Sequence, residues 1–291
     1  MKTSHKKLYF LPALMVGFGL ILAGRTIAQT FTTLHSFTAY STNPPYTNSD
    51  GENPNGLIVS GNTLYGEAVD SGSSGSGTLF AVNINGTGFT NLYAFTALNN
   101  NTNSDGNAPR GGLILLGNTL YGTTVTGGVG GNGTVFAFNI SSMVFTNLHS
   151  FTATSVPSIE GGTNSDGAKP DSGLVLSGNT FYGTTSFGGS SGNGTVFAVN
   201  TDGTDFTNLH TFTSANYVIT NSDGENPNGL IVSGDTLYGT ASSGGISGNG
   251  TVFAINIDGT DFTNLYSFTA TSSFITSNGG PTATEPGQKP G

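Results

Sequence analysis

Hydrophobic and polar positions follow one pattern that recurs four times along the chain. Each unit contains the polar sequence N-S-D-G, then G-L-I-V-S-G-N-T-L-Y-G, a Gly/Ser stretch, G-T-V-F-A and finally F-T-N-L-H-S-F-T, with small changes. N-S-D-G begins at Asn48, Asn103, Asn164 and Asn221, so successive units lie 55, 61 and 57 residues apart. A period in this range indicates a repeat architecture in which each unit is one supersecondary element.

The third unit shows how the apolar runs divide into strands. Residues 173–177 and 180–185 are β-rich runs separated by Gly178 and Asn179, which predicts a tight hairpin. Residues 195–200 and 205–213 predict a third and a fourth strand. Glycine is too frequent for helices, and no apolar period of 3.6 residues is present.

Four antiparallel strands per unit predict an all-β fold, a β-propeller-like array of four four-stranded antiparallel blades. The array is expected within residues 29–270. Its repeats are residues 39–96, 97–152, 153–213 and 214–269. A β-solenoid is the alternative, although its rungs are usually shorter and tight two-residue hairpins do not suit parallel coils.

One segment is left over by this division. Residues 30–38, T-F-T-T-L-H-S-F-T, repeat the fourth strand with no blade before it. We therefore predict one extra N-terminal strand. It could cap an edge of the array or pair with residues 272–275, or the chain could be part of a longer array.

Both ends of the chain differ from the repeats. Lys2, Lys6 and Lys7 precede an apolar run over residues 8–24, and Thr26-Ile27-Ala28 supplies small residues for cleavage before Gln29. This pattern predicts a signal peptide over residues 1–28. An uncleaved membrane anchor is the alternative, but the run is shorter than the roughly 20 residues of a spanning helix. Residues 271–291 are predicted to be a disordered polar tail.

Charge restricts the classes of partner. Removing residues 1–28 leaves three basic residues against 16 acidic ones, a net charge of −13. Because nucleic-acid binding depends on Lys and Arg neutralising phosphates, a nucleic-acid partner is excluded. The same acidity disfavours anionic membranes, and no membrane insertion is expected after signal cleavage. Cations and neutral ligands such as glycans remain compatible. The absence of cysteine excludes disulfides and thiolate chemistry.

The long connections of the predicted blades carry the candidate binding residues. The connections from strand two to three and from strand four to the next unit are long, whereas the others are tight. The connection from strand four to the next unit contains the aspartate of N-S-D-G. The speculative ligand-binding residues are therefore Asp50, Asp105, Asp166 and Asp223. Their oxygens could bind Ca²⁺, the single cofactor considered. The alternative is turn chemistry, in which Asp hydrogen-bonds its own backbone and Gly supplies positive φ.

Two further positions bear on chemistry. His35, His149 and His210 share one repeat position with Tyr93 and Tyr266, which indicates an aromatic packing position and not a catalytic base. Glu67 and Asp70 depart from the other copies, as an active site would require, and are copy-specific candidates. No Ser/His/Asp arrangement is visible.

The motifs that the four copies share most closely resemble a known repeat family. The sequences G-L-I-x-S-G-N-T-L-Y-G-T-T and G-G-x-x-G-N-G-T-V-F-A resemble the GloVer (Gloeo/Verruco) tandem repeat of exported bacterial proteins. They match best at residues 112–137, 173–198 and 229–254, whereas the first copy departs between Glu67 and Ser76. The resemblance implies export, a propeller-like all-β fold and often a C-terminal anchor. Residues 277–291 contain no apolar anchor, and the family contributes no catalytic residues.

Together these features predict a secreted, extracellular or cell-surface protein, the periplasm included. Its expected role is that of a non-catalytic binding module for a glycan or a cell-surface protein. The alternatives are an extracellular enzyme acting on glycans or lactones and a purely structural surface element.

Overall fold

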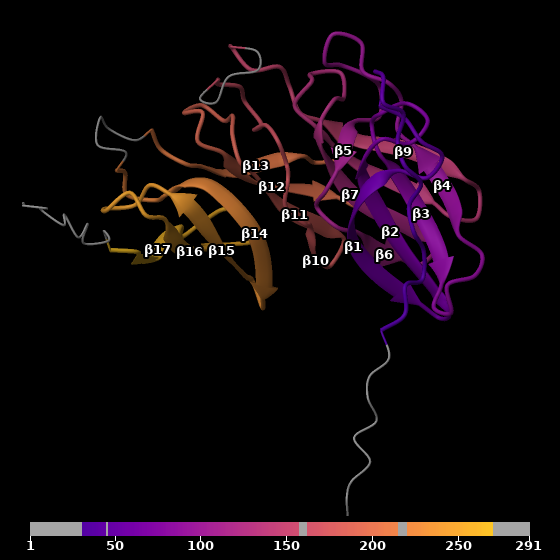
Figure 1. The fold of residues 1–291 in the computed structure, drawn as a ribbon. Coiled ribbons are helices and arrows are strands. Elements are labelled where there is room, and N and C mark those ends of the chain that lie inside the picture. Colours follow the sequence, from indigo (N-terminus) through magenta and orange to yellow (C-terminus); the bar gives the residue numbers. More distant parts are fainter. Residues whose placement is uncertain (1–30, 45, 157–161, 215–219, 270–291) are drawn as a thin grey trace, which may run out of the picture. The chain divides into compact units, whose positions relative to one another are not determined.

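A computed structural model describes residues 31–44, 46–156, 162–214 and 220–269, and within these ranges the chain contains strands and no helix (Figure 1). No helix in the described residues is long and apolar enough to cross a membrane. The four sheets lie within one compact unit, Leu34–Gly291. The predicted signal peptide and C-terminal tail, and the pairing of residues 272–275, lie outside the described residues.

Each repeat forms one antiparallel sheet, and in the first, third and fourth repeats the strands pair in sequence order. In the second repeat, two short strands both pair with the strand that follows them. The first sheet contains β1 (Glu52–Ser60), β2 (Thr63–Asp70), β3 (Thr78–Asn83) and β4 (Thr90–Ala94). The second contains β5 (Asn107–Pro109), β6 (Ile114–Leu116), β7 (Thr119–Thr126), β8 (Thr134–Asn139) and β9 (Val144–Ser150). The third contains β10 (Val175–Ser177), β11 (Thr180–Thr185), β12 (Thr195–Asn200) and β13 (Thr207–Thr211). The fourth contains β14 (Glu225–Ser233), β15 (Thr236–Ser243), β16 (Thr251–Asn256) and β17 (Thr263–Ser267). The antiparallel ladders confirm the blade prediction over parallel solenoid coils.

Local sequence explains the hairpins of each sheet. Ser60 pairs with Thr63, so the turn has two residues, and its Gly61 has a φ of 58°. Two-residue turns that match the strand twist need positive φ, which glycine supplies without steric cost. In the third repeat, the ring of Phe197 in β12 lies over Gly183 in β11. A Cβ added at Gly183 would come within 2.5 Å of that ring. The glycine of L-Y-G is therefore required by the phenylalanine of T-V-F-A.

Successive sheets pack face to face through apolar side chains. The forward face of a sheet is the side that packs on the next repeat, and its backward face is the side that packs on the previous one. Leu79 and Phe95 of the first repeat share one buried cluster with Leu113 and Phe136 of the second. Equivalent clusters join the second repeat to the third and the third to the fourth. Because a four-stranded sheet has two apolar faces, burying both of them requires neighbouring sheets.

The predicted N-terminal strand differs from expectation. Residues 31–38 form no strand. The side chains of His35 and Phe37 nevertheless pack on the first sheet. The His35 ring stacks on Phe89 with centroids 3.6 Å apart, and Phe37 contacts Phe80 edge to face at 5.4 Å. The segment thus occupies the place that a preceding repeat would fill without forming its strand.

The phenylalanine that follows the fourth strand is predicted to contribute more to stability inside the array than at its end. Phe151 is fully buried between the second and third sheets, whereas Phe268 is 47% exposed. We expect Phe151→Ala to lower the free energy of unfolding by about 3–5 kcal/mol through lost burial and a cavity. Phe268→Ala is the matched control and should change it little. Urea unfolding measures both, and equal losses would contradict the packing described here.

Candidate functional site

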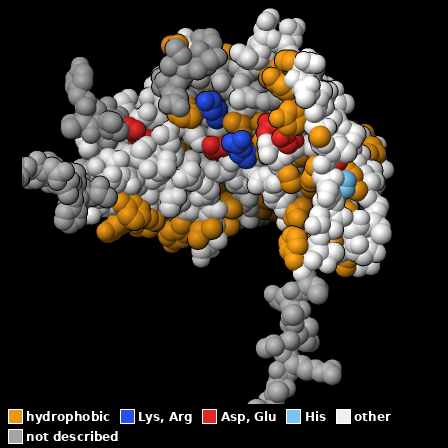
Figure 2. All heavy atoms as spheres, in the orientation of Figure 1, with side chains coloured by type: hydrophobic (Ala, Val, Ile, Leu, Met, Phe, Trp, Pro, Cys, Tyr) orange, Lys and Arg blue, Asp and Glu red, His pale blue; other side chains and the backbone are white. Residues whose placement is uncertain are grey.

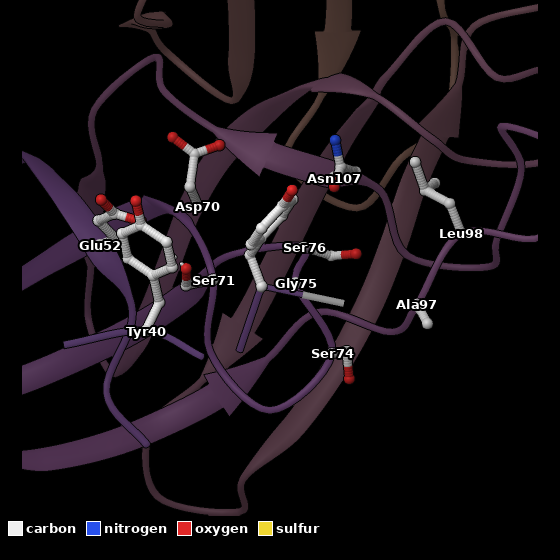
Figure 3. Close-up of a pocket in the computed structure, with 11 residues that line it drawn as sticks. Tyr40, Glu52, Asp70, Ser71, Ser74, Gly75, Ser76, Ala97, Leu98 and Asn107 are labelled. Atoms are coloured by element: carbon white, nitrogen blue, oxygen red, sulfur yellow. Dashed lines mark hydrogen bonds between the residues drawn. The ribbon is translucent and has the colours of Figure 1, made fainter. Parts of the chain in front are cut away.

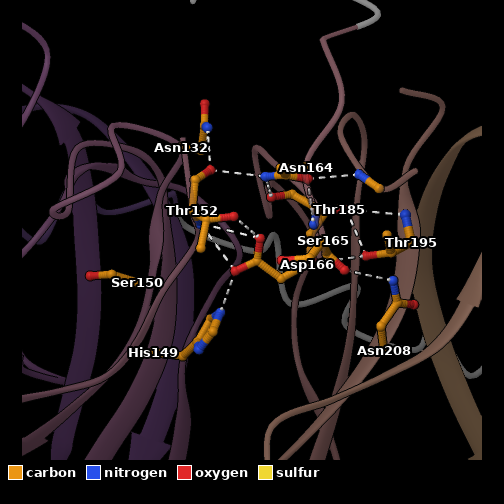
Figure 4. Close-up of polar contacts among 12 residues, drawn as sticks. Asn132, His149, Ser150, Thr152, Asn164, Ser165, Asp166, Thr185, Thr195 and Asn208 are labelled. Carbon is orange, nitrogen blue, oxygen red and sulfur yellow. Dashed lines mark hydrogen bonds and ion pairs between the residues drawn. The ribbon is translucent and has the colours of Figure 1, made fainter. Parts of the chain in front are cut away.

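The N-S-D-G aspartates are buried hydrogen-bond acceptors between successive repeats. Asp166 is 5% exposed and lies after the fourth strand of the second repeat. Its Oδ2 accepts hydrogen bonds from His149 Nε2 at 3.0 Å and from the Thr152 amide at 3.0 Å, and its Oδ1 accepts one from the Thr152 hydroxyl (Figure 4). One carboxylate therefore fixes an aromatic side chain and a threonine of the preceding repeat.

The other three aspartates have the same partners. Asp50 accepts hydrogen bonds from His35 and Thr38, and Asp223 accepts them from His210 and Thr213. Asp105 accepts them from Tyr93 and Thr96, with the tyrosine hydroxyl 2.7 Å away. The shared His/Tyr position is thus an aromatic packing position, as predicted, and also a hydrogen-bond donor. Sequence reasoning missed this second role, although His and Tyr are the aromatic pair that both stack and donate.

Hydrogen bonding keeps the carboxylates of Asp50, Asp166 and Asp223 ionised. Burial by itself raises the pKa of Asp166, but the hydrogen bonds from His149 and Thr152 outweigh it and hold the pKa below its ordinary value of 3.8. Asp50 and Asp223 show the same balance. An ionised carboxylate can only accept hydrogen bonds, so the nearby imidazole nitrogen is the donor.

The asparagine of N-S-D-G uses its whole hydrogen-bonding capacity within the fold. Asn164 Oδ1 accepts hydrogen bonds from the amides of Gly167 and Gly189, at 2.9 and 2.8 Å. Its Nδ2 donates to the carbonyls of Thr152 and Gly167, at 2.8 and 2.7 Å (Figure 4). The same four bonds recur in the other copies, at Asn48, Asn103 and Asn221. This side chain ties together the end of one repeat, its own loop and the glycine-rich loop.

The predicted calcium ligands are not brought together. Each N-S-D-G aspartate lies among threonine and aromatic donors. Among the described residues, no group of three or more His, Asp or Glu side chains could hold a metal ion. Ligand or calcium binding by Asp50, Asp105, Asp166 and Asp223 stays a prediction, whereas the turn and interface contacts of the same residues are formed.

Glu67 of β2 is a buried acid between the first two sheets. It is 0% exposed, and its Oε1 accepts a hydrogen bond from the Gly112 amide at 2.6 Å, while Oε2 has no partner. Burial raises its pKa from the ordinary 4.5 to about 7, against the opposing hydrogen bond from the Gly112 amide. In the next two repeats, Thr123 and Thr184 stand here and donate to backbone carbonyls of the following repeat. Glu67 therefore contacts the next sheet. It is not among the residues that line the pocket at Asp70.

Asp70, the other copy-specific candidate, lies in a pocket of 650 Å³ among the loops of the first two repeats (Figure 3). The pocket combines aromatic, acidic and small polar side chains. It is lined by Tyr40, Tyr46, Glu52, Asp70, Ser71, Ser74, Gly75, Ser76, Ala97, Leu98 and Asn107.

Two carboxylates are fixed at one end of the β1–β2 hairpin. Glu52 and Asp70 are direct partners across the ladder. Asp70 accepts a hydrogen bond from Asn53 Nδ2 at 2.8 Å, and Glu52 accepts one from the Ser71 hydroxyl at 3.2 Å. These contacts orient both carboxylates before any ligand arrives.

Two tyrosines complete the pocket and were not found from the sequence. Tyr40 and Tyr46 are 46% and 53% exposed, and their rings meet edge to face at 5.9 Å. Both belong to the connection before the first N-S-D-G, whose sequence A-Y-S-T-N-P-P-Y is absent from the other copies. That copy-specific aromatic content was the available signal.

Asp166 generates a prediction about acid stability. Because its folded pKa lies below the unfolded value, its stabilisation is present above about pH 4 and is lost as the pH falls through the folded pKa. Asp166→Asn should lower the free energy of unfolding by about 2–3 kcal/mol at pH 7 and by much less near pH 2. Chemical denaturation across this range measures both. Asp235→Asn, which restores the asparagine of the other copies, is the control and should leave stability unchanged.

Glu67 generates a prediction of opposite sign. Its folded pKa lies above the unfolded value, so the folded state is progressively destabilised as the pH rises from about 4.5 to 7. Glu67→Gln should remove this dependence and stabilise the protein by about 3 kcal/mol above pH 7. Melting temperatures of wild type and variant between pH 4 and 9 test it. Parallel curves would show that Glu67 does not titrate in this window.

Comparison with known proteins finds one similar repeat family. The model of the Gloeobacter/Verrucomicrobia repeat matches residues 156–285. No curated protein matches the chain.

Solved structures with similar folds include a nidogen/laminin complex, at 14% identity and a TM-score of 0.43 over 75% of this chain. TolB from Acinetobacter baumannii is 11% identical, with a TM-score of 0.41 over 70% of this chain. The chain spans 64% and 40% of the lengths of those two structures. The matched residues 156–285 contain the third and fourth sheets.

Proposed function

We propose that this protein is a secreted or surface-displayed, non-catalytic binding module whose ligand is a neutral glycan. The observation that carries the proposal is the pocket in which Tyr40 and Tyr46 stand beside Glu52 and Asp70. It is the copy-specific part of a repeated scaffold. Binding sites concentrate on loops held by a rigid scaffold, which is the setting of this pocket.

The lining suits a polyhydroxylated ligand. Tyrosine rings offer apolar faces with a polar tip, and carboxylate, amide and hydroxyl groups exchange hydrogen bonds with sugar hydroxyls. Two carboxylates in the pocket and a net charge of −9 for the chain disfavour anionic ligands. The pocket also contains Ala97 and Leu98, so it combines an apolar floor with a few fixed polar groups, as small-molecule sites do.

The extracellular part of the proposal rests on the predicted signal peptide and on the repeat family. Residues 156–285 match a repeat that the sequence resemblance associates with exported proteins. Cleavage between Ala28 and Gln29, with recovery of the mature chain outside the cytoplasm, is the result expected when the chain is expressed with its N-terminus intact, and recovery of the uncleaved chain from the cytoplasm would contradict this part.

One observation favours an enzyme as the second candidate. Glu52 and Asp70 are opposed in one pocket, and glycoside hydrolysis uses a pair of carboxylates flanking the scissile bond. A panel of polysaccharides tests this alternative. Release of reducing sugar that disappears in both Glu52→Gln and Asp70→Asn would make the pocket catalytic.

Binding is tested on an array of neutral oligosaccharides, followed by calorimetric titration of the strongest binder in calcium and in EDTA. We expect Tyr40→Ala and Asp70→Asn each to weaken binding by about tenfold or more, the equivalent of about 1.4 kcal/mol. Asp235→Asn is a matched control outside the pocket and should bind as wild type. Silence of the whole array would overturn the glycan proposal, and loss of binding in EDTA alone would establish calcium as a cofactor.

A further inference from the structure

Among the described residues, no further sheet packs on the forward face of the fourth sheet. Leu265, Tyr266 and Phe268 of the last repeat are 51%, 53% and 47% exposed, and Ile231 of β14 is 68% exposed. Figure 2 shows hydrophobic side chains gathered where Figure 1 draws β14–β17. In the three preceding repeats, the residue equivalent to Phe268 is fully buried: Phe95, Phe151 and Phe212.

The backward face of the first sheet is the other half. Leu57 and Val59 of β1 are 60% and 64% exposed. The residues equivalent to Leu57 in the later repeats, Leu113, Leu174 and Leu230, are only 7%, 7% and 6% exposed, because each packs beneath the preceding repeat. In β1, the exposed apolar side chains of Leu57 and Val59 lie on the backward face. In β14, the exposed side chain of Ile231 lies on the forward face.

The outer part of this backward face is already occupied by residues 34–38. Leu34 and His35 lie against Gly86 and Phe89, and the His35 ring and Thr38 both hydrogen-bond Asp50. The third repeat binds the second in the same way, through Gly203, Phe206 and Asp166. The sequence of residues 34–38 is L-H-S-F-T, and that of residues 265–269 is L-Y-S-F-T. One segment occupies this site, and a nearly identical segment is exposed at the far end of the array.

We propose that copies of this protein associate head to tail. The forward face of β14–β17 of one copy packs on the backward face of β1–β4 of the next, and residues 265–269 replace residues 34–38. Tyr266 then donates to Asp50 as Tyr93 donates to Asp105, and its ring stacks on Phe89 as that of Tyr93 stacks on Phe145.

The exchange keeps the contacts of the displaced segment and adds new ones. Residues 34–38 form no strand, whereas residues 263–267 belong to β17 and reach the site already ordered. The incoming sheet also covers Leu57 and Val59 and buries Ile231. Because the two faces differ, the interface is heterologous, and repetition produces rings or open filaments.

A second copy fits this face better than an unrelated partner. Each exposed group has its complement on the other end of the same chain, in a geometry that the chain already forms between its first and second, second and third, and third and fourth repeats. An unrelated partner would have to reproduce the aspartate, the stacked phenylalanine and the leucine at the same spacing.

Two double variants of the full chain test the proposal by sedimentation velocity. The head variant carries Leu57→Asp and Val59→Asp, and the tail variant carries Ile231→Asp and Phe268→Asp. We expect the mass of the wild type to rise with concentration in steps of one chain, and each variant alone to keep the mass of one chain. An equimolar mixture should double in mass and go no further, because each variant retains one intact face.

A matched control carries Val129→Asp and Ile246→Asp, both at loop positions that are 75% exposed, and should associate as wild type. Circular dichroism checks that every variant is folded. Leu57→Asn with Val59→Asn, and Ile231→Asn with Phe268→Asn, replace any pair that lowers the melting temperature.

Three results would overturn the proposal. They are a wild type that keeps the mass of one chain at all concentrations, a head variant that dimerises alone, and a mixture that does not associate. Phe37→Ala separates displacement from simple apposition. It loosens residues 34–38 and should increase the associated fraction, whereas a decrease would show that the segment stays in the interface.

Discussion

The N-S-D-G aspartate at the start of each repeat is the contact on which the array depends. Its carboxylate is buried, and that of Asp166 accepts hydrogen bonds from an aromatic ring and a threonine of the repeat before it. In Asp50, Asp166 and Asp223 these bonds hold the pKa low, so the carboxylate is ionised. An isolated buried charge would be strongly destabilising, so this aspartate is tolerated because several donors surround it. The pairing is directional, because the donors lie on the forward side of one sheet and the acceptor lies at the start of the next. It therefore fixes the order and spacing of the sheets as well as their stability.

The same requirement explains why the repeated motif carries so little specific chemistry. Asparagine, aspartate and glycine of N-S-D-G are all engaged with the backbone or with neighbouring repeats. The threonine of G-T-V-F-A adds a buried hydrogen bond, as Thr195 does to the Asp166 carbonyl. A residue that is fully engaged in the fold is not free to change with the ligand. Specific chemistry is left to positions at which one copy differs, and the loops of the first repeat supply them in Tyr40, Tyr46 and Asp70.

The two copy-specific acids show how far sequence reasoning reached. Glu67 and Asp70 both break the pattern, and the sequence alone treats them alike. Both belong to β2, but Glu67 is buried against Gly112, whereas Asp70 lines the pocket. Likewise, the His/Tyr position was correctly assigned to packing, but its hydrogen bond to an aspartate 12 to 17 residues later depends on how a long loop folds back.

The sequence by itself determined the number of repeats, the strands, the tight turns and the all-β class. These follow from local rules: alternating apolar residues, glycine where positive φ is needed, and repetition at a fixed period. Only the tertiary structure decided which faces of the sheets meet and which polar residues are engaged between them. It also showed that residues 31–38 dock without forming a strand, and that Tyr40 and Tyr46 share a pocket with Glu52 and Asp70. Burial and hydrogen-bond partners depend on contacts between residues far apart in the chain. The local sequences around residues 57 and 230 are identical, yet their exposures differ because a neighbouring repeat covers only the second.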